Sequence, residues 1–486
     1  MPTTRIVHTV TASDMTSLRQ GREEATGADL VELRLDGVRD VDVAGALQGR
    51  TSPVIVTCRP VWEGGAFDGS EETRRRLLNQ AVALGAEFVD VERRATWRPD
   101  RGASPTQLIL SDHEFSEVPR DLAARVAAMR AEQPGVVKVA AMPQCAADCL
   151  ALGSAADGHP ATVVIGMGVF GRLTRVLPSR FGSCWTYGGA AAPGQFSVDE
   201  LSRQFRVRDV SAATEVYGVT GHPLGHSASP AMHNAAFQAM GRDAVYVPLE
   251  AVSVDDARMV AEALGLRGLS VTAPFKHGWP LGQAGYDDEA SRRLRTINTL
   301  KRTDTGWLGR NVDGDGFLDP LDSRGVALRG SRVVVLGAGG AAGAVARALL
   351  TRGARVVLSA RRPSAAQALA TALGADVAAW PPTGPWDMLV NATPAGTWPR
   401  DAEAPVSFGD LAAAVVYDLV YNPEETALLR AARAGGSQVI GGLEMLVGQA
   451  VRQSAWWTAQ APPAAVMTAA ARAWIATRAV RESGER

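Results

Sequence analysis

The segment SRVVVLGAGGAAGAVARALLTRG, residues 331–353, decides the fold of one half of the chain. Its β-branched run is typical of a buried strand, and the Ala- and Leu-rich run after it is typical of a helix. Gly337, Gly339 and Ala342 lie in the turn between them and match the pattern G-x-G-x-x-G/A. Glycines at these positions let a pyrophosphate approach the backbone at the start of the helix, so the segment predicts a dinucleotide-binding α/β domain.

The next predicted strand, residues 354–362, indicates which dinucleotide binds. Domains for NAD usually place an acidic residue about 20 positions after the glycines to hold the ribose 2′-hydroxyl. No Asp or Glu occurs between Gly337 and Ala375, and the strand ends in Arg361 and Arg362. Paired guanidinium groups suit a 2′-phosphate, so the sequence favours NADP(H). The alternative is a turn without a ligand, followed by two solvated arginines in an arginine-rich chain.

Composition sets the broad class of the protein. A chain of 486 residues is expected to form two or three domains. Its 50 basic and 51 acidic residues nearly balance, which gives no electrostatic reason to expect a nucleic acid or a membrane as partner. We see no apolar run of the roughly 20 residues that span a bilayer, no signal peptide and no metal-ligand spacing. The sequence thus predicts a cytoplasmic enzyme without a metal.

The first 210 residues alternate β-branched runs with amphipathic helical segments. Strands joined by helical crossovers form parallel sheets, and eight of them close a (β/α)₈ TIM barrel. The predicted strands cover residues 4–10, 29–35, 53–59, 87–92, 106–113, 135–141, 161–167 and 181–187. Polar residues gather towards the carboxyl ends of these strands, at the barrel face where active sites form.

Lysine is rare in this chain and occurs only at Lys138, Lys276 and Lys301. An amine can lose its proton and attack a carbonyl group, whereas a guanidinium cannot. Lys138 lies inside an apolar strand and shares one strand face with Val136 and Ala140, so we expect its side chain to point into the barrel. A structural ion pair with a carboxylate is the alternative interpretation for Lys138.

Residues 1–210 resemble type I 3-dehydroquinate dehydratase through six motifs: VELRLD (31–36), TCRPVWEGG (57–65), SDHEF (111–115), KVAAMPQ (138–144), TRVLPSRFGS (174–183) and APGQ (192–195). The resemblance implies that Lys138 forms an imine with the substrate ketone, that His113 is the general acid and base, and that Glu63 orients His113. It implies substrate binding by Glu32, Arg34, Arg59, Arg175 and Gln195.

Two further expectations concern this half. We expect burial and the neighbouring arginines to lower the pKa of Lys138, which would favour the neutral amine. Ala191 departs from the family pattern, which usually has Ser there, so one hydroxyl contact to the substrate would be lost.

Residues 216–455 resemble shikimate dehydrogenase through seven motifs: GHPLGHSASPAMHNAAF (221–237), VTAPFK (271–276), INTL (297–300), NVDGDG (311–316), NATPAG (391–396), DLVYNP (418–423) and GLEMLVGQA (442–450). The resemblance implies that Lys276 and Asp313 relay a proton beside the reacting carbonyl group. It implies substrate binding by Ser227, Ser229, Thr272, Asn298, Tyr421 and Gln449. It implies NADP binding by Gly337, Ala338, Gly339, Gly340, Ala341, Arg361, Arg362 and Thr393. Val312 departs from the pattern, which has Thr before the Asp.

The order of the two halves resembles the family of bifunctional dehydratase–dehydrogenases of the shikimate pathway. We expect a barrel over residues 1–210, a substrate domain over 211–316 completed by 442–486, and a Rossmann NADP domain over 317–441. The expected substrates are small molecules: 3-dehydroquinate, 3-dehydroshikimate and shikimate. A catabolic quinate/shikimate dehydrogenase fused to a dehydratase, and a ligand-sensing regulator built from the same modules, stay open. So do the oligomeric state and the channelling of the intermediate.

Overall fold

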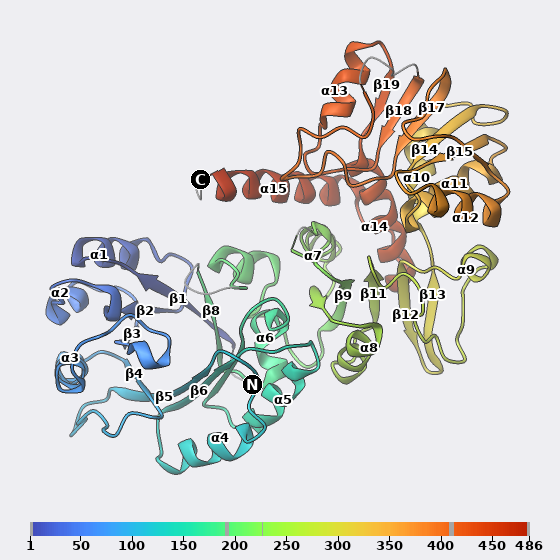
Figure 1. Cartoon of the computed structure of the whole chain (residues 1–486). Helices are drawn as coiled ribbons and strands as arrows, with labels where there is room; N and C mark the ends of the chain where they lie inside the picture. Colours follow the sequence, from blue (N-terminus) through green and yellow to red (C-terminus); the bar gives the residue numbers. More distant parts are fainter. Residues whose placement is uncertain (1–2, 190–193, 226, 408–412, 484–486) are drawn as a thin grey trace. The chain divides into compact units, whose positions relative to one another are not determined.

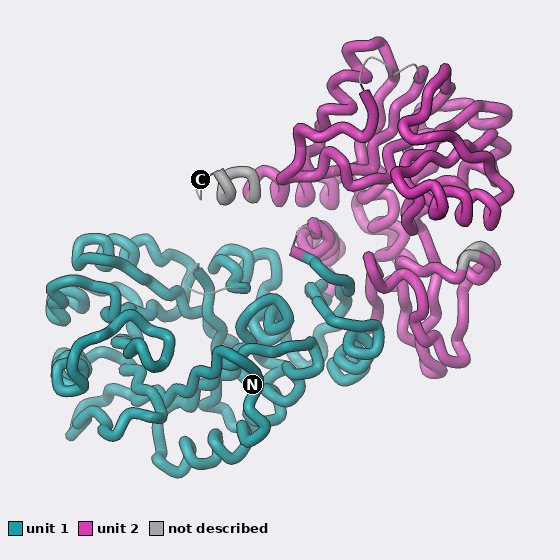
Figure 2. The backbone as a smooth tube through the Cα atoms, in the orientation of Figure 1, with its two compact units in different colours: residues 1–224, 244–266 teal, residues 225–243, 267–486 magenta. Residues whose placement is uncertain are grey.

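The computed structural model describes residues 3–189, 194–225, 227–407 and 413–483 (Figure 1). The chain divides into two compact units (Figure 2). Unit 1 comprises residues 1–224 and 244–266, and unit 2 comprises residues 225–243 and 267–486. Ala191, where we expected a lost hydroxyl contact, lies outside the described residues.

Unit 1 contains a parallel sheet of eight strands in the order β7-β6-β5-β4-β3-β2-β1-β8, which confirms the predicted barrel. The seam between the first and last strands of this order is joined by the N–H of Cys184, which donates to the carbonyl of Thr162 at 2.9 Å. Across the same seam, the hydroxyl of Ser183 accepts from the N–H of Val164 at 2.8 Å. The strands are Arg5–Thr11 (β1), Leu30–Arg34 (β2), Val54–Thr57 (β3), Phe88–Glu92 (β4), Gln107–Glu114 (β5), Val136–Ala141 (β6), Thr162–Gly166 (β7) and Trp185–Gly188 (β8).

Helices cover the outside of the barrel and leave its carboxyl end for the connecting loops. The α-helices are Met15–Glu24 (α1), Val43–Leu47 (α2), Glu71–Ala83 (α3), Leu122–Ala131 (α4), Asp148–Ala156 (α5) and Arg172–Val176 (α6). Two short 3₁₀-helices follow strands, Leu35–Gly37 (η1) after β2 and Val61–Glu63 (η2) after β3. A third, Pro178–Phe181 (η3), follows α6, and a π-helical turn, Glu200–Gln204 (η4), follows β8.

The interior of the barrel has an apolar layer of side chains and a separate polar layer that contains Lys138. Phe88, Ile109, Val136 and Trp185 form part of one buried cluster. Alternation along β6 turns Lys138 to the same side as Val136. The predicted inward direction of Lys138 is confirmed, since it lines the cavity described below.

One predicted strand, residues 181–187, is wrong in its first half. Pro178–Phe181 forms the helix η3, and Gly182 ends it with φ +71°, a left-handed conformation that glycine adopts without a steric penalty. The strand β8 therefore begins only at Trp185.

Unit 1 continues beyond the barrel into a parallel strand pair, Glu215–Gly221 (β9) and Ala244–Glu250 (β10), and the helix Val254–Ala263 (α8). The carboxylate of Asp256 on α8 accepts from the barrel N–H groups of Ala146 at 3.0 Å and Ala147 at 2.8 Å. Helix α6 of the barrel also packs against β10.

Unit 2 contains the predicted dinucleotide-binding domain, a parallel sheet with the order β16-β15-β14-β17-β18-β19. In chain order this is 3-2-1-4-5-6, the doubly wound order whose ligands bind at the carboxyl ends of the strands where the order reverses. The strands are Arg332–Leu336 (β14), Arg355–Ser359 (β15), Asp376–Val377 (β16), Trp386–Asn391 (β17), Ala413–Asp418 (β18) and Gln438–Ile440 (β19). Its helices are Gly340–Thr351 (α11), Pro363–Leu373 (α12) and Ala427–Ala434 (α13).

The remainder of unit 2 holds an antiparallel arrangement that the sequence analysis did not predict. Strands β11, β12 and β13 pair antiparallel in succession. They are Gly268–Val271 (β11), Thr299–Thr303 (β12) and Gly306–Arg310 (β13), and the helices beside them are Ser229–Ala239 (α7), Glu289–Leu294 (α9), Asp313–Ser323 (α10), Gly442–Thr458 (α14) and Ala464–Ser483 (α15). Helix α14 packs against α10, and α15 packs against α7.

Candidate active sites

A cavity of about 500 Å³ opens at the polar layer of the barrel. Seven of the eight residues that the sequence predicted for this half line it: Glu32, Arg34, Arg59, His113, Lys138, Arg175 and Gln195. The eighth, Glu63, is buried behind His113. The structure therefore brings together residues from six separate segments of the chain, as their places at the strand ends predicted.

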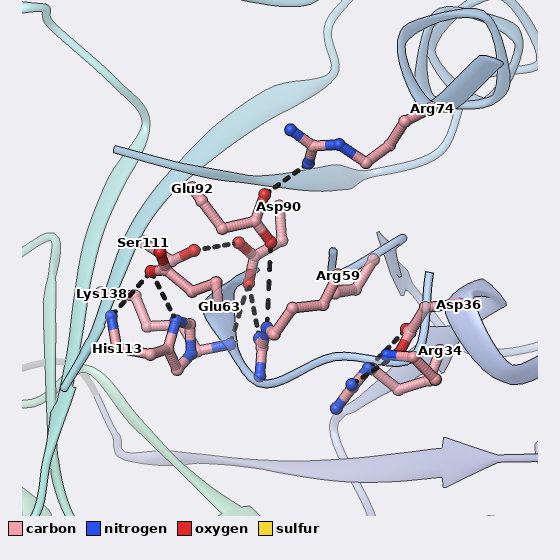
Figure 3. A network of polar contacts seen from close by, with 12 residues as sticks. Arg34, Asp36, Arg59, Glu63, Arg74, Asp90, Glu92, Ser111, His113 and Lys138 are labelled. Carbon is pink, nitrogen blue, oxygen red and sulfur yellow. Dashed lines mark hydrogen bonds and ion pairs between the residues drawn. The ribbon is translucent and has the colours of Figure 1, made fainter. Parts of the chain in front are cut away.

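Lys138 forms two ion pairs inside the barrel, of which Figure 3 shows the one with Asp90. Its amine lies 2.9 Å from Asp90 and 3.4 Å from Glu32, and the ring of Tyr187 lies 4.6 Å from it. Burial disfavours the charged amine, yet the carboxylates of Asp90 and Glu32 outweigh it and raise the pKa of Lys138 above its usual value. The expectation of a lowered pKa is wrong for this state, because it considered the neighbouring arginines and left out the carboxylate of Asp90.

Glu32 accepts hydrogen bonds on both carboxylate oxygens. The hydroxyl of Thr9 donates to it at 2.9 Å and that of Thr57 at 3.0 Å. Burial opposes its ionisation, but the charges of Lys138 and Arg59, with a smaller contribution from Arg34, lower the pKa of Glu32 to about 2. The carboxylate is thus a fixed negative charge that can accept from a substrate hydroxyl group.

His113 and Glu63 form a buried acid–base pair. Glu63 accepts the backbone N–H of His113 at 2.8 Å, and the same oxygen lies 3.3 Å from Nδ1 of the ring. Burial, with the charges of Arg59 and Lys138, lowers the pKa of His113 well below its usual value. Burial raises the pKa of Glu63 to about 7. A neutral imidazole held at Nδ1 leaves Nε2 for proton transfer.

Arg175 lines the same cavity and is 2% exposed. Among the described side chains, Nε and Nη1 of its guanidinium have no hydrogen-bond partner. Burial, together with the charge of Arg172, lowers its pKa to about 10. A buried cation with unsatisfied donors is costly unless an anion completes it, so Arg175 is suited to bind a carboxylate of a ligand.

Two acidic residues on β4 belong to this site and were missed by the sequence analysis. Asp90 binds Lys138 and accepts from the hydroxyl of Ser111 at 2.5 Å, and Glu92 lies 2.5 Å from Arg74 (Figure 3). Their spacing of two along a strand places both on one face. The alternation of acidic and apolar residues in EFVDVE (87–92) could have indicated that Asp90 and Glu92 point into the barrel. The same alternation also fits a strand with one face in solvent.

Unit 2 contains a second network, built around Lys276 and Asp313. The amine of Lys276 lies 2.5 Å from one oxygen of Asp313, and Asn298 donates to the other oxygen at 2.8 Å. The same amide of Asn298 also donates to Gln449 on α14 at 3.1 Å. The structure therefore joins four predicted residues, and both oxygens of Asp313 are fixed by hydrogen bonds.

The glycine turn lies beside this network. Gly337 has φ +113°, and a Cβ there would come 3.0 Å from the carbonyl of Ala392, so the turn needs glycine. A Cβ on Gly340 would come 3.5 Å from the side chain of Lys276. The start of helix α11 is thus within reach of the lysine, and helix starts of this kind bind phosphate groups.

The residues around this turn fit a dinucleotide. A cavity of about 280 Å³ is lined by Ala341, Thr393 and Tyr421 together with Ala392, Pro394, Thr397, Trp398, Leu419, Val420 and Asn422. Arg361 and Arg362 are exposed at the carboxyl end of β15, where a ribose 2′-phosphate would lie. Ala338 and Gly339 complete the turn. A Cβ on Gly339 would meet nothing within 4 Å, so the space beside this residue is free for a ligand.

Three predicted substrate residues of unit 2 lie outside this network. Ser227 accepts the N–H of Ser229 at 3.3 Å at the start of α7, and Thr272 follows β11. Among the residues that the structure describes, none of these three is hydrogen-bonded to Asp313 or Asn298. The side chain of Val312 is buried, and its N–H donates to Asn298 at 3.0 Å, so the backbone at this position supports the network.

Within the described part of the chain, no group of three or more His, Cys, Asp or Glu side chains is arranged to hold a metal ion. Of the helices formed by those residues, none is both long and apolar enough to span a membrane.

Comparison with protein families assigns both halves. The model for type I 3-dehydroquinase matches residues 6–212. The model for the shikimate dehydrogenase substrate binding domain matches residues 219–300, and that for the shikimate 5′-dehydrogenase C-terminal domain matches residues 442–472.

Comparison with whole proteins finds the same two kinds of enzyme. The chloroplastic bifunctional 3-dehydroquinate dehydratase/shikimate dehydrogenase of Arabidopsis thaliana is 31% identical over 479 residues, which cover 90% of this chain and 79% of that protein. The NADP⁺ shikimate dehydrogenase of Moorella thermoacetica is 40% identical over 274 residues, which cover 53% of this chain and 92% of that protein. A crystal structure of a shikimate dehydrogenase in complex with NADP⁺ is 33% identical with a TM-score of 0.52, covering 55% of this chain and 97% of that one.

Proposed function

We propose residue roles for this chain, which belongs to the family of bifunctional 3-dehydroquinate dehydratase/shikimate dehydrogenases. The chain is a lyase and an NADP-dependent oxidoreductase of the shikimate pathway. It converts 3-dehydroquinate to 3-dehydroshikimate in the barrel and reduces that product to shikimate in the second half. We assign the barrel to residues 1–210, the substrate domain to 211–316 with 442–486, and the cofactor domain to 317–441.

The cavity residues suit imine chemistry in the barrel. Lys138 gives a proton to the carboxylate of Asp90, attacks the ketone and forms an imine with release of water. The imine withdraws electrons, and His113 removes the adjacent proton. His113 returns that proton to the β-hydroxyl, which leaves as water, and hydrolysis of the imine regenerates the lysine. Arg175 binds the substrate carboxylate, while Glu32, Arg34, Arg59 and Gln195 bind its hydroxyl groups.

The residues of unit 2 suit proton transfer to a carbonyl oxygen. When bound, NADPH supplies the hydride. Lys276 donates the proton, and Asp313 holds the lysine in place and shares its charge. Thr272, Asn298, Tyr421 and Gln449 orient the ring of the substrate, and Ser227 with Ser229 holds its carboxylate. The prediction of a cytoplasmic location stays a prediction, and the Arabidopsis relative is named chloroplastic.

One observation carries the proposal: a buried lysine, an imidazole–carboxylate pair and an unpaired guanidinium line a single cavity. The test is incubation of the whole chain with 3-dehydroquinate and NADPH while nicotinamide oxidation and product identity are followed together. Lys138→Met should stop the first step and leave reduction of added 3-dehydroshikimate intact, and Lys276→Met should do the reverse. Turnover of 3-dehydroquinate by Lys138→Met would refute the assigned roles.

A further inference from the structure

Arg74 is a charged residue with no place on the substrate cavity. It comes from helix α3 and is fully buried, with 0% of its surface exposed. Its guanidinium lies 2.5 Å from Glu92 and 2.7 Å from Glu71, and its carbon centre lies 4.9 Å from the ring of Trp97. Burial of such a group is costly, and an apolar residue would fill the space with less loss of solvation. Packing alone therefore does not explain why an arginine occupies this buried position.

Glu92 is the group that Arg74 holds inside the barrel. The carboxylate lies 2.5 Å from Arg74 and 3.8 Å from Arg59. Burial and the nearby charge of Asp90 raise the pKa of Glu92 to about 7, although both arginines oppose this. The titratable and charged groups that face it are Cys58, Arg59, Glu63, Arg74 and Asp90, and Glu71 is paired with Arg74. Near neutral pH its charge thus depends on its arginine partners.

Arg59 connects Glu92 to the reacting lysine. It lines the substrate cavity and lies 3.8 Å from both Glu92 and Asp90. Asp90 in turn binds Lys138 at 2.9 Å. Charges therefore alternate in sign from Arg74 through Glu92, Arg59 and Asp90 to Lys138 (Figure 3).

We propose that Arg74 is a positioning residue for the dehydration: it holds Glu92 as a carboxylate, and Glu92 keeps Arg59 at the cavity wall. If Glu92 lost its charge, Arg59 would have Asp90 as its remaining carboxylate partner and would compete with Lys138 for it. The reacting amine and the substrate-binding guanidinium would then both be displaced. The inference rests on the proposed function of the barrel.

The test compares pH profiles of kcat/KM for 3-dehydroquinate in the whole chain. Arg74→Met should lower kcat/KM at pH 7 by roughly 10- to 100-fold, the range expected for a misplaced reacting group. Without the cation at residue 74, Glu92 takes up a proton more readily, so the midpoint of the acid-side decline should rise by about 1–3 pH units. Arg74→Lys keeps a charge and should fall between wild type and Arg74→Met.

Two variants separate this role from a structural one. Arg94→Met removes an exposed arginine that lies over the Trp62 ring at 5.2 Å, a ring that Arg74 also contacts, and should leave the profile unchanged. Adding Glu92→Gln to Arg74→Met should remove the shifted transition, since no carboxyl group remains there to titrate, and should leave kcat/KM low across the pH range. The rate of shikimate oxidation by the same samples reports the concentration of folded unit 2, to which the dehydration rate is normalised.

The outcomes are distinct. A wild-type chain that does not dehydrate 3-dehydroquinate refutes the proposed function. An active wild type with an unshifted midpoint in Arg74→Met overturns the inference alone, even if activity or Tm falls. If Arg74→Met fails to fold, as near-UV circular dichroism would show, Arg74→Lys decides: a raised midpoint supports the inference and an unchanged one overturns it.

Discussion

The amine of Lys138 donates to the carboxylate of Asp90 across 2.9 Å, and this contact holds the lysine as a cation in the absence of substrate. A cationic amine cannot attack a ketone. Entry of the substrate must therefore coincide with loss of a proton from Lys138, and the carboxylate of Asp90 is the nearest acceptor.

Asp90→Asn should shift formation of the imine to lower pH. The amide keeps the shape of the carboxylate but not its charge, so the pKa of Lys138 should fall by about 1–3 units. The rate at which borohydride traps the substrate adduct on Lys138, measured against pH, should show a midpoint lower by the same amount. Ser111→Ala, which removes the hydroxyl that donates to Asp90 but leaves the charge, is the matched control. Identical midpoints for Asp90→Asn and wild type would contradict this.

Glu63→Gln should make the protein less active and, in alkaline solution, more stable. The pKa of Glu63 is about 7 in the folded protein and 4.5 as a free group, so its ionisation opposes folding increasingly from about pH 4.5 and fully above about pH 7. This cost amounts to roughly 3 kcal/mol at most and is absent below about pH 4.5, where the carboxyl group is protonated in both states. Thermal melts of Glu63→Gln and wild type should differ at pH 8 and converge towards pH 4.5.

The exposed Glu72 offers a control for that experiment. Glu72→Gln should change neither the melt at pH 8 nor the rate of dehydration. A stabilisation by Glu63→Gln that is the same at both pH values would show that a cause other than ionisation is at work.

Asn298→Ala should slow the dehydrogenase and spare the dehydratase. The change removes the donor to Asp313 at 2.8 Å and the bond to Gln449 at 3.1 Å, and it leaves a buried carboxylate oxygen without a partner. We expect kcat/KM for shikimate oxidation to fall by roughly 10- to 100-fold. The dehydration rate of the same sample should stay at the wild-type value. A normal oxidation rate would remove Asn298 from the proton-transfer network.

Arg361→Ala combined with Arg362→Ala should weaken NADPH binding without weakening NADH binding. Two lost charge-assisted contacts to a 2′-phosphate, at about 1.5–3 kcal/mol each, predict an increase in the Kd for NADPH of at least about 100-fold. Arg355→Ala, at the opposite end of the same strand β15, is the control. Equal losses for both nucleotides would indicate that the arginines act on the fold rather than on the phosphate.

Much of the barrel and its site could be predicted because strand periodicity and strand ends carry the relevant information. Once Lys138 was placed on an inward face, the residues that end neighbouring strands had to surround it. The protonation state of Lys138 could not be predicted, because it depends on Asp90, a residue two strands away whose distance follows from the barrel register. The hairpin β12–β13 was missed for a different reason: its short strands carry Lys301, Arg302 and Arg310, which weaken the apolar pattern.

The bonds from Asp256 to Ala146 and Ala147 limit how the two activities can be studied apart. A gene fragment that begins at codon 211 would leave the carboxylate of Asp256 without these two donors, and one that stops at codon 210 would uncover the face of α6 that packs on β10. A loss of activity in a truncated protein could therefore come from a missing catalytic residue or from disrupted packing, and the two causes could not be separated. Single-activity versions of this enzyme are better made by point substitution at Lys138 or Lys276 in the uncut chain.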